Sequence, residues 1–454
     1  MRKIIQYMMM ALIAVVLASC ANDISEESTP TVKSNIRFVV DDFPMFEKPS
    51  TRTIGEEDKG KTAWAVGDEI CIKLESKELG IQTATLKYNG VKFEIQDGNS
   101  LCYLEGEPVT AYAYYAPNRR WRNGSLDFKD IFGNPNGTAE FLEATCTVHY
   151  GDNNYVDISF ANATRNYSRL RIATIPKTEI KVDADNFAPT DNPNRLYMTY
   201  TLTSDEKGNA YLYGTFYNNS IVTVKYRGAT LKTYKFSKET ENAKSYALDA
   251  TVISANSAEE IKSAIQKEVA DGKTAIKLNI ASDAGANEFK TIREAFKNVQ
   301  DATIDLTLIG CKEIPADGLK ELNALKSIFL PDVTKIGMNA LSRCVYLEEI
   351  CAPNVSTIDE RAFAGFIMLE KVTLGELTDV RGEANSGGGI FDDDNSTPYI
   401  DLYLPKNQEV MKCEFDKNSN QYIWKPTGEK YFASSDSDDG IFLGYQFRSV
   451  RSWE

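Results

Sequence analysis

Bulky apolar residues recur every 22 positions in the last third of the chain, between residues 314 and 380. Each 22-residue unit carries an apolar stripe that it cannot bury alone, and stacking the units would bury it. A fixed period of this length, with apolar residues at set offsets, is typical of a solenoid. The four series are Ile314, Ile336, Ile358 and Val380; Leu319, Leu341 and Phe363; Leu325, Leu347 and Leu369; and Ile328, Ile350 and Val372.

A second pattern, in which apolar and polar residues alternate, runs from about residue 36 to residue 251. Alternation with period two predicts strands with one buried face. Turn-forming pairs such as Asn89-Gly90 and Asn136-Gly137 separate the segments, so we expect antiparallel β-sandwiches. The stretch 183–194, rich in Asp, Asn and Pro, is expected to be a long loop. The later strands are predicted at 197–203, 209–217, 220–226, 230–236 and 245–251.

Between these two patterns, residues 254–310 alternate predicted helices and strands. Ser257-Ala258-Glu259-Glu260 is a capping box that predicts a helix to about Ala270. Asn287 is expected to cap a second helix, and strands are predicted at 276–280 and 304–308. Because the first repeat of a solenoid needs a cover for its open face, we interpret this segment as an N-terminal cap.

The repeat unit itself reads L-x-x-I-x-L-P followed by V-x-x-I-x-x-x-A-[LF], as in Leu325-Lys326-Ser327-Ile328-Phe329-Leu330-Pro331. It resembles the BspA-like leucine-rich repeats of surface proteins, with Pro after the strand in place of an Asn ladder. The repeats are expected over 311–405, interrupted by a polar insertion at 382–397, and residues 406–454 are expected to form a C-terminal cap.

Residues between the buried positions of a strand point to the opposite face. In the repeat strands these residues would form an outward row that a partner could bind, and exposed aromatic side chains are favoured anchors. An ordinary surface row is the alternative. The row consists of Asp305, Thr307, Ser327, Phe329, Glu349, Cys351, Lys371, Thr373, Asp401 and Tyr403.

The N-terminus indicates a destination outside the cytoplasm. Arg2 and Lys3 precede a short apolar run, which predicts a cleaved signal over 1–19. Leu17-Ala18-Ser19-Cys20 resembles the lipobox of bacterial lipoproteins, which implies acylation of Cys20 and stable attachment to the outer membrane. An ordinary secretion signal with an incidental cysteine is the alternative. The acidic segment 20–32 is expected to be a flexible tether, and it resembles the surface-export signals of Bacteroidetes lipoproteins.

Several short motifs in the alternating region resemble Bacteroidetes fimbrillin-like domains. They include Thr62-Ala63-Trp64-Ala65-Val66-Gly67-Asp68-Glu69-Ile70, Ala111-Tyr112-Ala113-Tyr114-Tyr115-Ala116-Pro117 and Ser168-Arg169-Leu170-Arg171-Ile172. The resemblance implies two tandem sandwiches, at 33–150 and 151–253, and Arg52 as a possible protease-processing site. The expected fold is mainly β: a tandem antiparallel, fimbrillin-like sandwich followed by a short, α/β-capped leucine-rich-repeat solenoid.

The charge and the cysteine spacing disfavour two classes of function, nucleic-acid binding and metal binding. The formal net charge is −14 with no strong basic cluster, which disfavours nucleic acid as a partner. If Cys20 is acylated, seven of the eight cysteines remain, which is an odd number. Their spacing along the chain does not match a metal-binding motif. The repeat places Cys311 and Cys344 in the core, where we interpret them as small apolar side chains.

Candidate chemistry is sparse. The single histidine, His149, lies in a predicted strand, and no nucleophile-elbow or phosphate-binding glycine motif is present. The acidic runs 392–394 and 436–439 could attract calcium but do not fit an EF-hand, and solvated loops are the favoured interpretation. We therefore expect no enzyme, no metal and no cofactor.

The sequence favours a lipid-anchored adhesion or binding protein of the cell surface, with a protein or glycan ligand outside the cell. A fimbrial subunit or tip component, which would have fimbrial partners, is the structural alternative. A lipoprotein that captures glycans is a further alternative.

Overall fold

The chain forms two compact units in the computed structural model. The first comprises Met1–Phe43, Ala63–Asp127 and Leu142–Ala161, and the second comprises Pro44–Thr62, Phe128–Phe141 and Asn162–Glu454. The structure describes residues 32–33, 36–47, 60–96, 101–117, 120–122, 125–127, 136–150, 154–161, 165–190, 196–381, 389–391, 397–406, 408–416, 421–430, 441–443 and 445–453.

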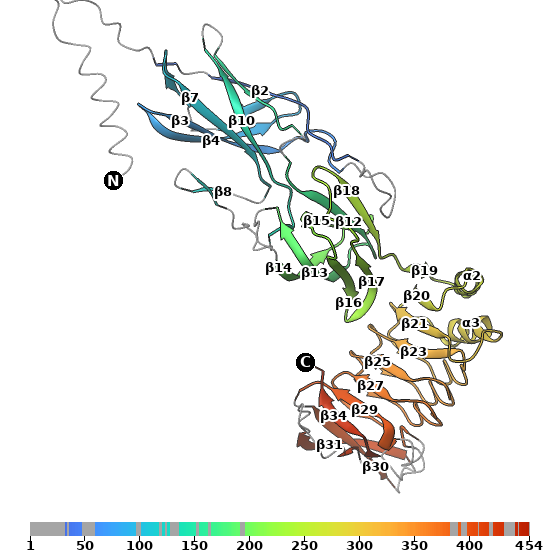
Figure 1. Cartoon of the computed structure of the whole chain (residues 1–454). Coiled ribbons are helices and arrows are strands. Elements are labelled where there is room, and N and C mark those ends of the chain that lie inside the picture. The colour runs from blue at the N-terminus through green and yellow to red at the C-terminus, as the bar shows by residue number, and fades with distance from the viewer. Residues whose placement is uncertain are drawn as a thin grey trace, which may run out of the picture. The chain divides into compact units, whose positions relative to one another are not determined.

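The first unit is built almost entirely from strands (Figure 1). Its main sheet has the order β2-β11-β10-β7-β3-β4-β5, and the pair β2–β11 is parallel. Strand β10 pairs with β7 through its first part and with β11 through its last part, so it turns the sheet around the core. The strands are β1 (Val32–Lys33), β2 (Arg37–Val40), β3 (Glu69–Ser76), β4 (Gly80–Tyr88), β5 (Phe93–Ile95), β6 (Tyr103–Leu104), β7 (Val109–Tyr115), β8 (Arg120–Arg122), β9 (Ser125–Asp127), β10 (Leu142–His149) and β11 (Tyr155–Ile158).

Trp64 stands at the centre of an aromatic cluster in this unit. Its ring packs edge-on against Phe43, Phe93 and Tyr115, with centroid distances of 4.8, 5.0 and 5.3 Å. The Asp68 carboxylate accepts the Ala65 N–H at 2.6 Å and closes the turn that leads into β3. The motif around Trp64 thus serves packing and turn formation.

The second unit begins with a seven-stranded sheet, which we call the second sandwich. Its order is β17-β16-β13-β15-β12-β18, with β14 also paired to β13. All pairs are antiparallel except β12–β18. The strands are β12 (Ser168–Ala173), β13 (Glu179–Pro189), β14 (Leu196–Thr203), β15 (Asn209–Phe216), β16 (Ile221–Tyr226), β17 (Ala229–Lys235) and β18 (Ser245–Asp249).

Strand β13 corrects one expectation. Its residues up to Pro189 belong to the strand, whereas the sequence predicts a loop from residue 183. Val182, Ala184 and Phe187 are fully buried. The polar residues between them face outward, and a bulge with Asn186 at φ 52° absorbs the change of register. The composition was misleading because Asp and Asn occupy only the outward positions and the bulge.

The boundary between sandwiches also lies later than expected. The sequence predicts that the first sandwich ends at residue 150. Strand β11 pairs with β10 and β2, so the first unit extends to Ala161. Residues 44–47 contribute to the second unit, where Phe46 is buried against Tyr167.

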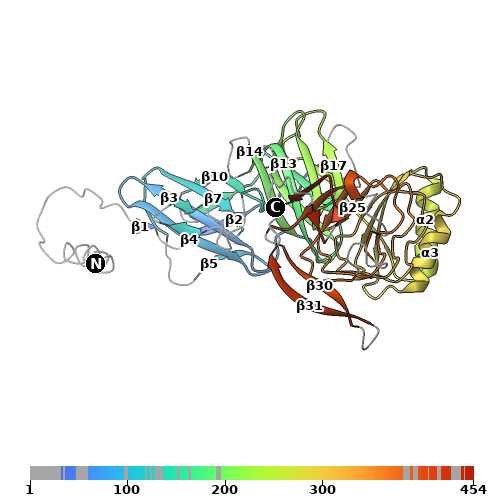
Figure 2. The ribbon, with the colours of Figure 1, turned by 90° about the horizontal axis from the view of Figure 1, so that it is seen from below.

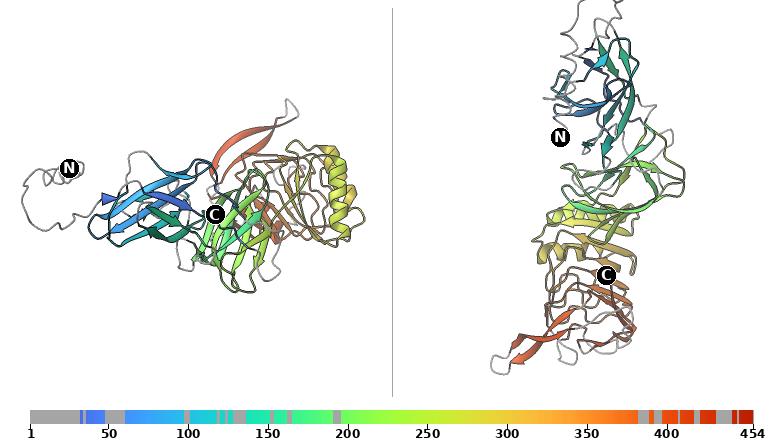
Figure 3. Two further views of the ribbon diagram at one scale, coloured as in Figure 1. Left: turned by 90° about the horizontal axis from the view of Figure 1, so that it is seen from above. Right: turned by 90° about the vertical axis from the view of Figure 1, so that its left-hand side faces the viewer.

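The solenoid is a stack of parallel strands (Figures 1 and 3). Its main sheet has the order β19-β20-β21-β23-β25-β27-β29-β34, and a second, smaller sheet has the order β22-β24-β26-β28. The main strands are β19 (Ile253–Ala255), β20 (Ala275–Ile280), β21 (Ile304–Ile309), β23 (Leu325–Phe329), β25 (Glu349–Ala352), β27 (Lys371–Leu374), β29 (Asp401–Leu404) and β34 (Ser449–Ser452). The small strands are β22 (Glu313–Ile314), β24 (Lys335–Ile336), β26 (Thr357–Ile358) and β28 (Asp379–Val380).

The 22-residue pattern is confirmed residue by residue. All members of the four apolar series are at most 4 % exposed. In the turns, residues with left-handed backbone repeat with the same period: Asp317, Asn339 and Arg361, and one turn later Glu321, Arg343 and Gly365. Only one of these six positions is glycine, so the stack holds the other five in a conformation that L residues rarely adopt.

Two helices lie side by side at the start of the solenoid (Figure 2). Helix α2 (Ala258–Ala270) is capped by Ser257, whose hydroxyl accepts the Glu260 N–H, as predicted. Helix α3 (Ala286–Phe296) begins after Gly285, so the expected cap at Asn287 is wrong. The Glu288 carboxylate accepts the Gly285 N–H at 2.9 Å and fixes the earlier start.

The C-terminal residues complete the solenoid. Strand β34 adds to the main sheet beside β29, and a hairpin projects from the stack (Figure 2). The remaining elements are η3 (Thr397–Tyr399), β30 (Glu409–Asp416), β31 (Gln421–Lys430), β32 (Ile441–Phe442) and β33 (Tyr445–Gln446). Among the residues that the structure describes, none belongs to a helix long and apolar enough for a membrane span.

Candidate binding surface

The outward residues of the main solenoid sheet form two straight rows, because the parallel strands pair in register. The first row is Asp305, Ser327, Glu349, Lys371, Asp401 and Ser449. The second row is Thr307, Phe329, Cys351, Thr373, Tyr403 and Arg451. The structure therefore brings all ten predicted face residues onto one sheet.

The first row is polar, and its members bind one another. Ser327 donates to Asp305 at 2.6 Å, and Lys371 pairs with Glu349 at 2.7 Å. Hydrogen bonding to Glu349 raises the pKa of Lys371. Hydrogen bonds from Arg448 hold the pKa of Asp401 below its usual value. These side chains remain largely or partly exposed, so the row presents fixed charges of both signs to solvent.

The second row is more apolar and more covered. Phe329, Cys351 and Tyr403 are half-buried. Lys371 of the first row lies over the Tyr403 ring, with 5.6 Å from Nζ to the ring centroid.

Two predicted members of the face are in fact buried. Thr307 is 9 % exposed because the second sandwich covers the start of the row. On the adjacent strand, Lys277 donates to the carbonyl oxygen of Leu231, and a Cβ added at Gly228 would lie 3.6 Å from Phe329 Cζ. Thr373 is 7 % exposed. It stands between Cys351 and the larger Tyr403, close to Trp453, whose indole donates to Leu374 O at 2.9 Å.

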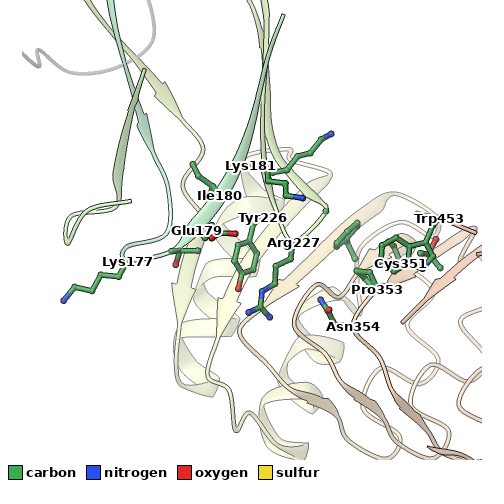
Figure 4. A pocket seen from close by; sticks show the side chains of 15 residues that line it. Lys177, Glu179, Ile180, Lys181, Tyr226, Arg227, Cys351, Pro353, Asn354 and Trp453 are labelled. Atoms are coloured by element: carbon green, nitrogen blue, oxygen red, sulfur yellow. The ribbon is translucent and has the colours of Figure 1, made fainter. Parts of the chain in front are cut away.

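A cavity of about 1000 Å³ lies over the second row, between the solenoid and the second sandwich (Figure 4). Phe329, Cys351, Thr373, Pro353, Asn354 and Trp453 line it on the solenoid side. The facing wall comes from the start of β13 and from the β16–β17 turn, and consists of Lys177, Thr178, Glu179, Ile180, Lys181, Lys225, Tyr226, Arg227 and Gly228.

A buried carboxylate fixes the junction beside this cavity. Asp332 is 2 % exposed and accepts hydrogen bonds from Tyr226 Oη at 3.0 Å, Arg227 Nη1 at 2.6 Å and Gly310 N at 2.9 Å. Burial, followed by the nearby Asp332 charge, raises the pKa of Tyr226 to about 12. The two walls of the cavity are therefore joined by a charged contact whose acceptor is inaccessible to water.

The remaining candidate chemistry has structural roles or stays open. Cys311 and Cys344 are fully buried free thiols, as predicted, and burial raises the pKa of each to about 12. His149 ends β10 and stacks on Tyr155 with a centroid distance of 4.1 Å. The described residues contain no cluster of three or more metal-ligating side chains. Cys20, Arg52 and the acidic runs 392–394 and 436–439 lie outside the described residues.

Sequence reasoning missed the sandwich wall and Trp453. One signal was available for the junction: Asp332 follows Pro331, and 22 residues later Asn354 follows Pro353. Asn354 donates to Pro331 O at 2.6 Å, so this position links neighbouring turns of the stack. Nothing in the repeat pattern indicates that Asp332 also binds the second sandwich.

Comparisons with known proteins give one family match and several distant structural neighbours. No curated protein matches it. Among solved structures, a Bacteroides fragilis protein proposed to act in cell adhesion shares 11% identity, with 48% of this chain and 92% of that chain covered and a TM-score of 0.26. A shaft pilin, SpaA, of Lactobacillus rhamnosus GG (E139A mutant) shares 11% identity, with 48% and 97% covered and a TM-score of 0.21. Residues 286–387 match the family of BspA type leucine rich repeat regions, in six copies.

Proposed function

We propose that this chain is a lipid-anchored adhesion or binding protein of the bacterial cell surface, in which the main solenoid sheet binds a protein or glycan outside the cell. The observation that carries this proposal is the in-register face of the solenoid. Its first row presents fixed charges of both signs, and its second row adds the aromatic side chains of Phe329 and Tyr403.

The physical argument concerns preorganisation. The face residues on β21, β23, β25, β27 and β29 sit on strands that are hydrogen-bonded to a neighbour on both sides, above a core of buried side chains. A rigid surface loses little conformational freedom when it binds, so its contacts contribute more fully to affinity. The match of residues 286–387 to BspA type repeats supports a surface role, and the lipobox-like Leu17-Ala18-Ser19-Cys20 supports anchoring.

Exposure of the intact, living bacterium to a protease tests the location. We expect the protease to remove the solenoid from intact cells, while a periplasmic protein remains whole in the same sample. A Cys20→Ser variant should no longer label with a radioactive fatty acid and should leave the membrane fraction. Protection of the solenoid until the outer membrane is broken would refute surface display.

The same cells distinguish the fimbrial alternative. A fimbrial subunit would run as a ladder of polymers on a gel of unboiled sample, whereas a monomeric adhesin runs as one band. A ladder that contains this chain would favour the structural role.

A further inference from the structure

Basic side chains predominate among the charged residues that line the cavity over the second row. The described lining residues include four basic side chains and one carboxylate, Glu179. Three of the four cations have carboxylate partners outside the lining, since Lys177 pairs with Glu206, Lys225 with Asp183 and Arg227 with Asp332. A cation that lines a concave surface attracts anions, and the fourth cation, Lys181, is the one that matters for a ligand.

Two of these cations are placed so that their repulsion destabilises the folded sheet. Lys181 of β13 and Lys225 of β16 are directly opposite each other in an antiparallel pair. Like charges in this position repel and destabilise the sheet. Asp183 neutralises Lys225 at 2.7 Å, but no described carboxylate lies within ion-pair distance of Lys181, which is exposed. Lys181 is therefore the charge that an incoming anion can neutralise.

The rest of the cavity supplies aromatic faces. Tyr226 and Arg227 extend from the sandwich wall toward the solenoid, and Trp453 lies on the opposite wall (Figure 4). Phe329 completes the solenoid side. Flat apolar rings beside hydrogen-bonding groups such as the Asn354 amide suit a ligand that has apolar ring faces and polar edges.

The backbone around the cavity argues against an extended peptide. Strands β13, β16, β23, β25 and β27 are each hydrogen-bonded on both sides, so none offers a free edge for strand addition. Strand addition is therefore excluded at these strands, and recognition by side chains suits sugar rings and their acidic substituents.

We propose that this cavity binds an acidic oligosaccharide, with a carboxylate or sulfate group at Lys181 and Lys225 and sugar rings against Tyr226, Phe329 and Trp453. This inference rests on the proposed function and names the class of ligand for one part of the surface.

Titration of the purified full chain with hexasaccharides tests the proposal. The probes are oligogalacturonate, which carries carboxylates, a sulfated glycosaminoglycan hexasaccharide, and neutral cellohexaose. We expect one or both acidic sugars to bind, with an affinity that falls as salt rises, and cellohexaose to bind at least about tenfold more weakly. Comparison of the two acidic sugars identifies the substituent. Binding of hexaglutamate as tight as that of the sugars would overturn the ligand class.

Charge reversal at Lys181 separates binding from folding. Lys181→Glu should weaken acidic-sugar binding at least about tenfold. It should leave the melting temperature unchanged or raise it, because the new carboxylate faces Lys225. Lys235→Glu is the matched control, since Lys235 is an exposed residue of β17 outside the cavity. Equal affinity in the wild type and the Lys181→Glu variant would refute the site.

Trp453→Phe provides an independent readout. We expect acidic sugar to change the tryptophan fluorescence of the wild type and to leave that of the variant unchanged. If acidic sugar binds but changes the tryptophan fluorescence of the wild type and of the Trp453→Phe variant alike, the sugar does not bind in this cavity. A chain that is displayed on cells and binds another partner, but no acidic sugar, would refute this inference and leave the proposed function intact.

Discussion

Arg227 of the second sandwich and Asp332 of the solenoid form an ion pair, with 2.6 Å between Nη1 and Oδ1. The carboxylate is almost fully buried, whereas the guanidinium remains half exposed. Tyr226 and the Gly310 amide also donate to Asp332, and Lys312 Nζ lies 3.8 Å from its Oδ1. One residue of the repeat thus organises the wall of the cavity and the start of the solenoid.

Replacement of Asp332 by alanine should destabilise this junction. The substitution leaves the Gly310 amide and the Tyr226 hydroxyl without their acceptor, which costs about 1–3 kcal/mol for buried polar groups. Urea denaturation measures the loss. Asp332→Asn keeps one acceptor oxygen and should lose less. Asp305→Ala, at an exposed carboxylate of the same solenoid, serves as the control and should change little. Equal stability of Asp332→Ala and Asp305→Ala would contradict the role of this contact.

Leu347→Ala tests the register of the repeats. Leu347 is fully buried in the solenoid core, and truncation of such a residue costs roughly 2–5 kcal/mol. Ile367→Ala is the matched control, because Ile367 belongs to a turn of the same solenoid and is 75% exposed. We expect the melting temperature to fall for the first variant and to stay within error for the second. Similar melting temperatures for the two variants would show that the assignment of buried and outward positions is wrong.

The buried thiols predict a dependence of stability on alkaline pH. Burial raises the pKa of Cys311 and Cys344 from an ordinary value of 9.0 to about 12. A group whose pKa is higher in the folded state contributes its full stability below the unfolded pKa and loses it as pH rises toward the folded pKa. The free energy of unfolding should therefore begin to decline above about pH 9, before tyrosines such as Tyr226 contribute.

Urea titrations at pH 8, 9 and 10 measure this decline. The Cys311→Ala/Cys344→Ala double variant is less stable overall but should show a flatter dependence on pH. Both thiols should also resist a thiol reagent in the folded chain and react after unfolding. Rapid modification of either thiol in the native protein would contradict its burial.

The parts of the fold that could be predicted from sequence are those in which one period dominates. The series through Leu347 identifies the core of the solenoid, and Ser257 with Glu260 identifies the start of α2 because that signal is local. Strand β34 could not be predicted, since its pairing with β29 joins residues far apart in the sequence without a repeat to relate them. The small sheet through Ile336 was missed for a different reason. Its buried residues form one of the four series, but its strands are only two residues long and show no alternation that would predict a strand.

The binding surface was predictable only within the repeats. Register fixes which residues of the solenoid point outward, and this placed Lys371 and Tyr403 correctly on one sheet. Burial of Thr307 depends on contact with the second sandwich, and burial of Thr373 depends on the size of its neighbours. Neither effect is encoded in the 22-residue period. Lys181 and Trp453 line the cavity but lie outside the repeats, so the repeat pattern could not predict the cavity.

Binding by matched variants tests the central claim most directly. Glu349→Ala/Lys371→Ala removes an exposed ion pair of 2.7 Å from the main sheet, and Glu313→Ala/Lys335→Ala removes one of 2.7 Å from the small sheet. Exposed pairs contribute about 0–1 kcal/mol, so both variants should fold. The measurement is the affinity of each purified full chain for whichever matrix protein or glycan the wild type binds in a panel of both. The account predicts that the main-sheet variant loses most of its affinity and that the small-sheet variant keeps it. Loss in the small-sheet variant alone, or equal affinity in both, would contradict the main sheet as the binding surface.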